Sequence, residues 1–301
     1  MESTSLPEQF KLSYQHSRPF LISNLTCFVP NLPKSLVGYK IAHLSDFHLG
    51  AATSISHIAA AIAQVNVLNP DLVCLTGDFI QYCRFLGHAL ATKFNPDFYR
   101  WVDYRRAVRG LAKELGEVLE TIEAQDGVLS VFGNHDYLEG LGTIVRQFPQ
   151  SIKWLTNSSV TIKRDNGFFI VAGIDDLNRG KPNIERAIEH ATELEAEEHK
   201  LSKLNSSFRV LLSHNPDITI KTAAKNINQH NLMLCGHTHG GQVRFPLVGP
   251  IVTRTKQKKH VQGLSQLNNT AIYVTNGAGY GGLGVRYRCP PEIVMIRLVN
   301  R

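Results

Sequence analysis

The sequence contains little cysteine, no long apolar run and a modest share of charged residues. Five of its 301 residues are cysteines, and no two of them are spaced as Cys-x-x-Cys. An odd, scattered set of cysteines argues against a disulfide framework or a zinc finger and predicts reduced thiols. Since no run of about 18 apolar residues occurs, we expect no membrane-spanning helix. The cysteines are Cys27, Cys74, Cys83, Cys235 and Cys289.

The N-terminal stretch MESTSLPEQFKLSYQ lacks the basic segment and the apolar segment of a secretory signal. We therefore expect a cytoplasmic protein, and a peripheral position on the inner membrane is compatible with that expectation. Hydrophobic residues make up 43% of the chain, which is enough for a sizeable core. The net charge of +7 favours an acidic partner: a phosphorylated substrate, nucleic acid or an anionic membrane face.

Short apolar runs alternate with helical patterns, which predicts an α/β fold (α+β in its mixed form) with buried strands. The Asn166-Gly167 pair predicts a hairpin turn, which adds antiparallel pairing to the sheet. Without an internal repeat or a linker, we expect a single domain over residues 1–301. The predicted strands are residues 40–44, 72–76, 128–132, 160–163, 168–173, 209–213, 232–235, 271–275 and 293–298, and the predicted helices are residues 55–68, 104–124, 183–204 and 218–229.

Polar residues follow five of the predicted strands at the point where each strand ends. In α/β folds, sites lie beyond the carboxyl ends of the strands, so we expect these segments to meet at one edge. Each of them carries a histidine, an aspartate or an asparagine. The segments are Ser45-Asp46-Phe47-His48, Gly77-Asp78, Gly133-Asn134-His135-Asp136, His214-Asn215-Pro216 and Gly236-His237-Thr238-His239.

Two of these segments place metal-binding side chains two residues apart, a spacing that points both to one side of an extended strand end. The neighbouring glycines let the backbone turn sharply and leave room for a ligand. Mixed imidazole and carboxylate ligands suit manganese, iron or zinc more than calcium or magnesium. Seven candidates are too many for one ion, so we predict two ions with a bridging carboxylate. The candidates are Asp46, His48, Asp78, Asn134, His214, His237 and His239.

The ordered series D-x-H, G-D, G-N-H-D, H and G-H-T-H resembles the calcineurin-like metallophosphoesterase superfamily. The stretches LPKSLVGYKIAHLSDFHLG, GHTHGGQVRFP and YVTNGAGY…VRYRCPPEIVMIRL are similar to its bacterial branch, which includes YkuE-type phosphoesterases and UDP-2,3-diacylglucosamine hydrolases. The resemblance implies a four-layer sandwich of two mixed β-sheets flanked by helices. It also implies a hydrolase of phosphoester or pyrophosphate bonds that uses two divalent ions, with manganese expected first and iron or zinc as alternatives.

The resemblance further implies a role for each candidate residue. Asp46, His48 and His239 would bind one ion, Asn134, His214 and His237 would bind the other, and Asp78 would bridge them. His135 would donate a proton to the leaving-group oxygen, and Asp136 would orient His135. A non-catalytic scaffold of the same superfamily is the alternative, although such members usually lack ligands that are all present here.

Residues 79–106 form an unusual segment that leaves directly from Asp78. The segment contains eight aromatic residues interleaved with arginine and lysine. This composition predicts a small helical cap able to meet a lipid or a membrane surface, and the alternative is an extra helical hairpin that covers the core. The aromatic residues are Phe79, Tyr82, Phe85, Phe94, Phe98, Tyr99, Trp101 and Tyr104.

An acylated sugar nucleotide needs apolar cover for its chains and cations for its diphosphate, so the cap favours a UDP-2,3-diacylglucosamine pyrophosphatase-like enzyme of the lipid A pathway. A broad phosphodiesterase or phosphomonoesterase of the YkuE type fits the motifs equally well. The basic residues 254–260 predict contact with a substrate phosphate or anionic lipid head groups, or else a solvated loop. The glycine-rich residues 277–284 are expected to shape the rim of the site. Nucleic acid is a disfavoured partner, because the aromatics lie in one cap and not along a basic stripe.

Overall fold

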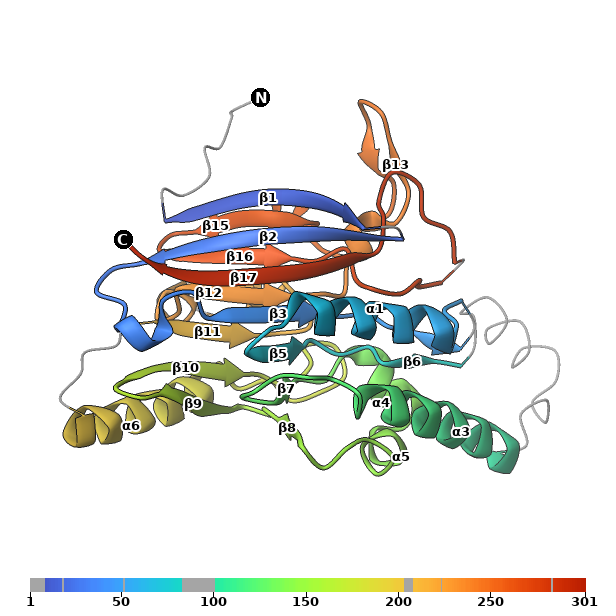
Figure 1. Ribbon diagram of the computed structural model, residues 1–301. Coiled ribbons are helices and arrows are strands. Elements are labelled where there is room, and N and C mark those ends of the chain that lie inside the picture. Colours follow the sequence, from blue (N-terminus) through green and yellow to red (C-terminus); the bar gives the residue numbers. More distant parts are fainter. Residues whose placement is uncertain are drawn as a thin grey trace.

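Two β-sheets face each other across a shared apolar core, with the helices outside (Figure 1). The computed structural model describes residues 9–17, 19–50, 52–82, 101–202, 208–222, 224–282 and 284–301. The first sheet has the strand order β1 (Phe10–Ser17), β2 (Phe20–Val29), β17 (Glu292–Asn300), β3 (Lys40–Leu44), β5 (Leu72–Leu75), β7 (Val128–Ser130) and β8 (Ile152–Trp154). The second sheet has the order β15 (Gly263–Leu267), β16 (Thr270–Val274), β12 (Leu232–Cys235), β11 (Arg209–Leu212), β10 (Gly167–Gly173) and β9 (Ser158–Arg164).

Both sheets mix parallel and antiparallel pairs. Strands β3, β5, β7 and β8 run parallel in the first sheet, and β10, β11, β12 and β16 run parallel in the second. Antiparallel pairs lie toward the sheet edges and between β17 and β3. Two further ribbons have two strands each: β4 (Leu49–Gly50) with β6 (Ile80–Gln81), and β13 (Arg244–Phe245) with β14 (Gly249–Pro250).

The central strands are apolar on both faces, which is why they appear in the sequence as continuous apolar runs. In β5, Leu72 and Cys74 pack between the sheets, while Val73 and Leu75 pack against helices on the outside. Cys235 of β12 is buried on the outer face of the second sheet, as a small apolar residue should be.

Helices cover both outer faces. Helices α1 (Ile55–Leu68) and α3 (Trp101–Leu119) pack on the first sheet, and α6 (Ile184–Ser202) packs on the second. The buried residues Val108, Ala112, Leu115 and Leu119 recur at helical spacing and place one stripe of α3 against the sheet. The predicted sandwich of two mixed sheets flanked by helices is confirmed. Short helices complete the fold: α4 (Asn134–Glu139), α5 (Leu141–Val145), α7 (Ile218–Lys221) and α8 (Ala224–Ile227), with the 3-10 turns η1 (Lys34–Leu36), η2 (His239–Gly241) and η3 (Lys258–His260).

The predicted hairpin between β9 and β10 is confirmed, but its turn lies one residue earlier than predicted. Arg164 pairs with Gly167, so Asp165 and Asn166 form the turn, and Asp165 has a φ of 48°. Gly167 belongs to the strand, where an added β-carbon would lie 2.6 Å from the Oγ of Ser35. The glycine therefore allows the strand to pack closely against η1.

Several other predicted elements differ from the structure. The helix predicted over residues 218–229 is broken into α7 and α8, because Thr222 leaves the helical region with a φ of −109° and a ψ of 155°. Strands β1 and β2 were not predicted at all. β1 carries polar residues such as Lys11, Ser13 and Gln15 at alternate positions, which interrupt the apolar run. Of the predicted cap at residues 79–106, residues 83–100 lie outside the described residues.

No helix in the described part of the chain is both long enough and apolar enough to cross a membrane.

Two glycines provide a matched test of this packing. Gly173 of β10 lies against the residues that directly follow β7 and β8, and an added β-carbon would lie 2.7 Å from both the Leu155 oxygen and Val131 Cγ1, whereas Gly110 in α3 has open space there. We expect Gly173→Ala to lower the free energy of unfolding by about 1–3 kcal/mol through overpacking. Gly110→Ala should raise it by about 0.5–1 kcal/mol, because alanine is the better helix former. Urea unfolding measures both changes in the free energy of unfolding, and equal effects of the two substitutions would contradict this packing.

Candidate metal centre

The carboxyl ends of five strands meet at one edge of the sandwich, on the side to which the arrowheads of β3, β11 and β12 point (Figure 1). The loops after β3 and β5 belong to the first sheet, as does the loop after β7, and those after β11 and β12 belong to the second. All seven predicted metal ligands lie on these five loops or on the first residue of the helix or 3-10 turn that follows, as Asn134 of α4 and His239 of η2 do. The edge therefore gathers residues that are separated by nearly two hundred positions in the sequence.

A first cluster consists of Asp46, His48 and His239, all buried. The Nε2 atoms of the two histidines are 2.9 Å apart, and Asp46 Oδ1 lies 3.8 Å from His48 Nε2 and 3.4 Å from His239 Nε2. Three ligand atoms converge on one small space, as in a metal site.

A second cluster consists of Asp78, His214 and His237. His237 Nδ1 lies 3.2 Å from His214 Nε2, which in turn lies 3.2 Å from Asp78 Oδ2. The same Oδ2 atom is 3.5 Å from His48 Nε2 of the first cluster. One carboxylate oxygen of Asp78 thus lies between the two clusters, where a bridging ligand would be.

The donor atoms of the site fit divalent cations. The amide oxygen of Asn134 is buried without a hydrogen-bond partner, and so is the Nδ1 atom of His48. A buried amide oxygen with no donor is costly unless something positive meets it. His214 donates from Nδ1 to the backbone oxygen of Thr76 at 2.6 Å, so its Nε2 faces the cluster. Burial alone would lower the pKa of His214, but the Asp78 carboxylate raises it to about 10, so a cation bound here would take the place of the Nε2 proton.

Electrostatics keeps His237, His239 and Asp78 in the forms that bind metal. Burial lowers the pKa of His237 to about 4, with a further contribution from the nearby His214, and burial lowers the pKa of His239 well below its usual value. Both imidazoles are therefore neutral near pH 7 and have free lone pairs. Burial alone would raise the pKa of Asp78, but the neighbouring His214 and His135 outweigh it and hold that carboxyl ionised.

The ligand loops have a strained backbone that the sequence did not predict. We expected Asp46 and His48 to share a side of an extended strand end, yet both have positive φ values, 56° and 46°. Asp78, His237 and His239 have φ values of 58°, 70° and 54°. Non-glycine residues are rare in this region, and they persist only where the surrounding structure enforces them. The predicted convergence of Asp46 and His48 is correct, but left-handed loops produce it. His237 and His239 separate into different clusters, as the family resemblance implied.

Glycines beside the ligands permit contact between loops. An added β-carbon at Gly133 would lie 2.6 Å from the backbone nitrogen of Asp78, and one at Gly236 would lie 2.7 Å from Ser45 Cβ. Because Gly236 comes so close, the backbone nitrogen of His237 can donate to both carboxylate oxygens of Asp46, at 3.1 and 3.0 Å. We predicted that the glycines leave room for a ligand, and the structure shows that they leave room for the neighbouring loop.

Asp136 has a different set of partners from the one expected. Its carboxylate accepts hydrogen bonds from the backbone nitrogens of Gly133 at 2.7 Å, Asp78 at 3.0 Å and Phe79 at 2.8 Å. No hydrogen bond between described residues joins it to the His135 ring. Burial, followed by the Asp78 carboxylate, raises the pKa of Asp136 to about 7. Asp136 therefore ties the Gly77-Asp78 loop to the start of α4 and does not orient His135 directly.

His135 lies at the edge of the clusters. Its ring centroid is 4.8 Å from that of His48, and its ring can share a ligand group with His48 and Asp78. It is more exposed than the buried ligands around it, which suits a group that meets a substrate. Burial lowers its pKa to about 4, partly offset by Asp78.

Two charged residues near the C-terminus support the site and were missed by the sequence reasoning. Arg286 donates to the backbone oxygens of Asn276 at 2.7 Å, Gly277 at 3.2 Å and Cys289 at 3.2 Å, and also to that of Gly279. These bonds hold the glycine-rich loop, and the loop in turn contacts the first ligand segment.

That loop reaches the first ligand segment through its backbone. Ala278 and Gly279 donate to the oxygens of Ser45 at 2.8 Å and Asp46 at 2.9 Å. Glu292 is buried and accepts from the Asn276 nitrogen at 2.6 Å. The clue in the sequence was that charged residues, Arg286 and Glu292 among them, interrupt the largely apolar late stretch. We predicted only that residues 277–284 shape the rim of the site, whereas in the structure they also anchor Asp46.

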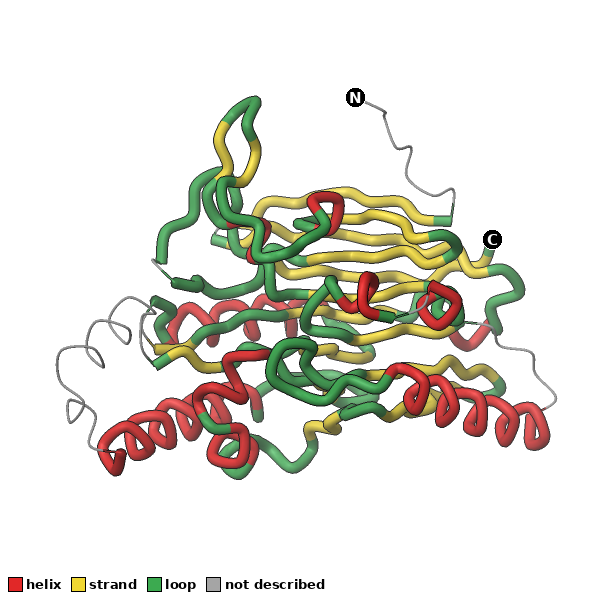
Figure 2. The backbone as a smooth tube through the Cα atoms, turned by 180° about the vertical axis from the view of Figure 1, so that it is seen from behind, coloured by secondary structure: helices red, strands yellow, loops and turns green. Residues whose placement is uncertain are grey.

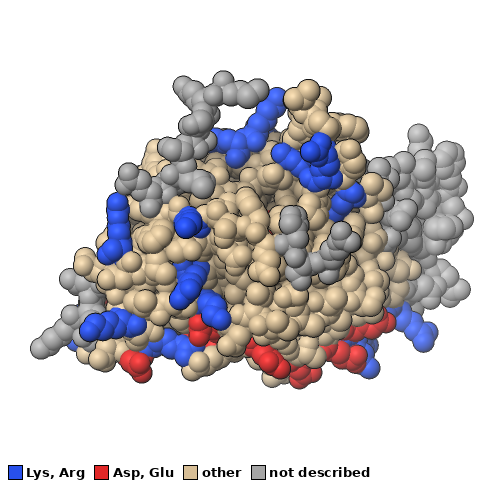
Figure 3. All heavy atoms as spheres, turned by 45° about the horizontal axis from the view of Figure 1, so that its top comes forward, with Lys and Arg blue, Asp and Glu red and all other residues tan. Residues whose placement is uncertain are grey.

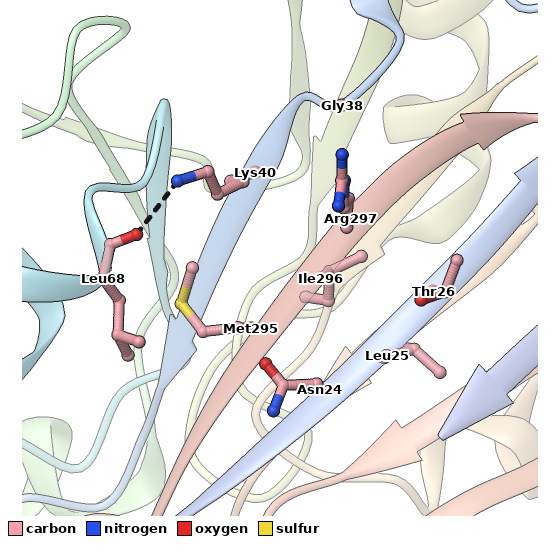
Figure 4. A pocket seen from close by; sticks show the side chains of 9 residues that line it. All are labelled: Asn24, Leu25, Thr26, Gly38, Lys40, Leu68, Met295, Ile296 and Arg297. Carbon is pink, nitrogen blue, oxygen red and sulfur yellow. Dashed lines mark hydrogen bonds between the residues drawn. The ribbon is translucent and has the colours of Figure 1, made fainter. Parts of the chain in front are cut away.

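A separate hollow of about 450 Å³ lies on the outer face of β2, β17 and β3 (Figure 4). Lys40 and Arg297 point into it, and Lys40 Nζ donates to the Leu68 oxygen at 3.2 Å. None of the nine predicted site residues lines this hollow. It is not the candidate site.

Comparison with known proteins agrees with the geometry. Residues 39–241 match the family model for calcineurin-like phosphoesterases, a range that includes all nine predicted site residues. The chain belongs to the calcineurin-like phosphoesterase family. It is a metal-dependent phosphoester hydrolase, as predicted.

The relatives of this phosphoesterase include bacterial proteins. It is 33% identical over 272 residues to the uncharacterized metallophosphoesterase YkuE of Bacillus subtilis (strain 168), covering 89% of this chain and 81% of the relative. It is 29% identical over 267 residues to the phosphodiesterase YaeI of Escherichia coli (strain K12), covering 87% and 82%. A dimetal phosphatase from Danio rerio superposes with a TM-score of 0.45 at 12% identity, over 80% of this chain and 88% of that chain.

The role of Arg286 can be tested with a conservative change. We expect Arg286→Lys to lower the free energy of unfolding by about 1–3 kcal/mol for each buried carbonyl that loses its donor, since one ammonium cannot serve four carbonyls. The loosened loop should also reduce the metal bound at Asp46, which elemental analysis after metal loading would detect. Arg288→Lys, on an exposed residue two positions away, is the control. If the two variants unfold at the same urea concentration and retain the same metal, Arg286 does not anchor the loop.

Proposed function

We propose that this phosphoesterase hydrolyses phosphodiester or pyrophosphate bonds with two divalent ions. The position of Asp78 Oδ2 supports this most directly, 3.5 Å from His48 Nε2 and 3.2 Å from His214 Nε2. A single carboxylate oxygen between the first cluster and the two histidines of the second is the arrangement that a two-metal site requires.

Each cluster has its own proposed ligands. Asp46, His48 and His239 would hold one ion, and His214 and His237 would hold the other. The partnerless Asn134 amide oxygen would complete the second set. Asp78 can bridge because the backbone nitrogen of His135 occupies its Oδ1 at 2.7 Å, which leaves Oδ2 for the ions. Manganese is our first choice for both positions, with iron or zinc as alternatives, because imidazole and carboxylate oxygen are mixed here.

The chemistry divides between the ions and the protein. Two bound cations would supply Lewis acidity to the phosphoryl oxygens and to the attacking water. His135, at the more exposed edge, would give a proton to the departing oxygen. Burial lowers its pKa to about 4 in the free enzyme, so His135 would first have to take up a proton, which an anionic substrate beside it would favour. Asp136 would act on the site by fixing the backbone of Gly133 and Asp78.

Arg254 would attract an anionic substrate to this edge. Its charge contributes to the lowered pKa values of His135, His237 and His239, and its guanidinium lies 3.4 Å from the place that a β-carbon on Gly282 of the glycine-rich loop would take. The side chain is exposed, and no ion pair involving it is present among the described residues. A guanidinium at the rim of a metal site suits a phosphate or diphosphate.

The relatives favour a broad phosphodiesterase of the YkuE or YaeI type as the first candidate for specificity. A UDP-2,3-diacylglucosamine pyrophosphatase of the lipid A pathway is the second candidate. It rested on the cap at residues 79–106, most of which lies outside the described residues.

We further propose that the enzyme works in the cytoplasm, peripherally on the inner membrane, where a lipid-linked nucleotide would be accessible. The described cysteines are free thiols, which supports a reducing compartment.

Two substitutions separate metal binding from proton transfer. Asp78→Ala should remove both ions and all activity, because it deletes the shared ligand. His135→Ala should retain the ions and slow kcat by about 10²–10⁴-fold, the usual cost of losing a general acid. Metal content and phosphodiester turnover are measured on the same preparations, with His190→Ala on α6 as the control. Full metal in Asp78→Ala, or full activity in His135→Ala, would refute these assignments.

A substrate panel tests the reaction class. With manganese loaded, we expect bis-p-nitrophenyl phosphate to be hydrolysed faster than p-nitrophenyl phosphate. UDP-2,3-diacylglucosamine is assayed beside them, and its preferred hydrolysis would move the assignment to the lipid A pathway. A metal-loaded protein that turns over none of the three would support the scaffold alternative.

A further inference from the structure

A hairpin projects from the body of the molecule directly after the ligand His239. Residues 244–252, called the apolar hairpin below, contain β13 and β14, which are joined through only two paired positions, Arg244 with Pro250 and Phe245 with Gly249. The ribbon stands clear of both sheets in two opposite views (Figures 1 and 2). From Phe245 to Val252 the sequence has no polar or charged side chain.

The side chains of the apolar hairpin face outward. Leu247 is 107% exposed and Val248 76%, and Ile251 and Val252 are 64% and 59% exposed. Folding tends to bury large aliphatic side chains. Single exposed ones are common, whereas a contiguous exposed group at the tip of a projection is uncommon. The group extends to Tyr287, whose ring lies 5.8 Å from that of Phe245.

The tip has a backbone conformation that leucine disfavours. Leu247 has a φ of 66°, and the nitrogen of Val248 donates to the oxygen of Pro246 at 2.8 Å, which makes a γ-turn around the leucine. Positive-φ γ-turns are rare and strained, and glycine or asparagine would adopt this one at lower cost. A strained turn that presents an exposed leucine serves no purpose in the folded chain alone. It indicates that the side chain is held out toward a partner.

The backbone of the tip is unusually poor in free donors. Pro246 and Pro250 have no N–H group, and the N–H of Val248 is already bonded within the turn. Exposed N–H groups are the main obstacle to placing irregular backbone in a lipid phase. The apolar hairpin therefore suits a lipid environment better than an ordinary loop does.

Cations surround the base of the apolar hairpin. Arg254, Lys256, Lys258 and Lys259 follow it in the chain, and all four are exposed. Asp217, the acidic residue that contacts this segment, accepts from Thr255 Oγ1 at 2.5 Å and from the backbone nitrogen of Lys256 at 3.1 and 3.0 Å. In the view of Figure 3, blue side chains lie around the projection at the upper right, while the red ones follow the lower edge. The charge of this face complements an anionic surface.

From these observations we propose that the apolar hairpin inserts its tip into the interfacial region of a bilayer containing anionic lipids, with Lys256, Lys258 and Lys259 on the head groups. Apolar side chains at the end of a convex projection, with lysines and an arginine behind them, fit a membrane interface better than a flat protein partner. Phe245 and Tyr287 would lie at head-group depth, where aromatic rings are favoured.

The proposal deepens the proposed function, because η2 connects the apolar hairpin directly to the site edge. A docked hairpin would hold Arg254 and His135 close to the head-group layer. The phosphoester of a membrane lipid or a lipid-linked nucleotide would then be the accessible substrate. This last step rests on the proposed function, while the docking itself does not.

Vesicle sedimentation of the full chain tests the docking. The protein should co-sediment with vesicles of equal parts phosphatidylglycerol and phosphatidylcholine, much less with phosphatidylcholine alone, and less as salt is raised. Leu247→Asp should weaken binding to the anionic vesicles by about tenfold or more, since it places a charge where an apolar side chain is buried. Lys258→Gln combined with Lys259→Gln should weaken it by about tenfold. Val67→Asp, on another strongly exposed residue at the end of α1, is the matched control and should bind as the unaltered chain does.

Two further readouts make the outcome decisive. Leu247→Trp should show a blue shift of its emission when anionic vesicles are added, because the new ring enters a less polar layer. Hydrolysis of bis-p-nitrophenyl phosphate in water should be the same in the Leu247→Asp variant as in the unaltered chain, so loss of docking and loss of the proposed activity are distinguishable. Unchanged vesicle binding by Leu247→Asp overturns the proposal. So does a dimer in solution that Leu247→Asp abolishes without any vesicle binding, because the occupant would then be a second copy of this chain.

Discussion

The carboxylate of Asp78 determines how the two halves of the site fit together. Its Oδ1 accepts from the backbone nitrogen of His135, while its Oδ2 lies between His48 and His214. The Asp78 nitrogen in turn donates to the buried Asp136. One residue thus joins loops from both sheets and the start of α4. In the absence of ions, the two histidines partly balance its buried charge, which would otherwise be costly.

Dense packing of loop against loop accounts for most of the unusual local chemistry. The ligand loops approach so closely that Gly133 and Gly236 have no room for a β-carbon, and five ligand residues have positive φ values. Such strain costs on the order of 1–3 kcal/mol per residue. The surrounding sandwich, with apolar strands buried on both faces, supplies the rigidity that holds the loops in place. Rigid strands with strained ends are a general way to hold ligands ready before a cation arrives.

Polar residues near the C-terminus support the loop that carries Asp46 and His48. Glu292 receives hydrogen bonds from Thr275 Oγ1 and the Asn276 nitrogen, and Arg286 donates to the carbonyls that follow. A buried carboxylate and a guanidinium act on the same short loop: the carboxylate accepts from one N–H group and one hydroxyl, and the guanidinium donates to C=O groups. Replacing either by an apolar residue would leave buried backbone groups unpaired. Glu292 and Arg286 therefore help to hold Asp46 in place.

The sequence by itself determined the elements whose signals are local. Continuous apolar runs located the central strands, since a strand buried on both faces has no polar position. The ordered polar segments after those strands identified the family and the seven candidate ligands, because the carboxyl ends of the strands meet at one edge whatever conformation the loops adopt.

Tertiary structure decided everything that depends on contact between distant segments. His237 binds the Asp46 carboxylate through its backbone nitrogen, across nearly two hundred residues, and Asp136 binds the backbone nitrogen of Asp78 from 58 residues away, because loops that are distant in the sequence are packed together. The exposure of Leu247 was also invisible in the sequence, where an apolar run looks the same whether it lies in the core or at the tip of a projection.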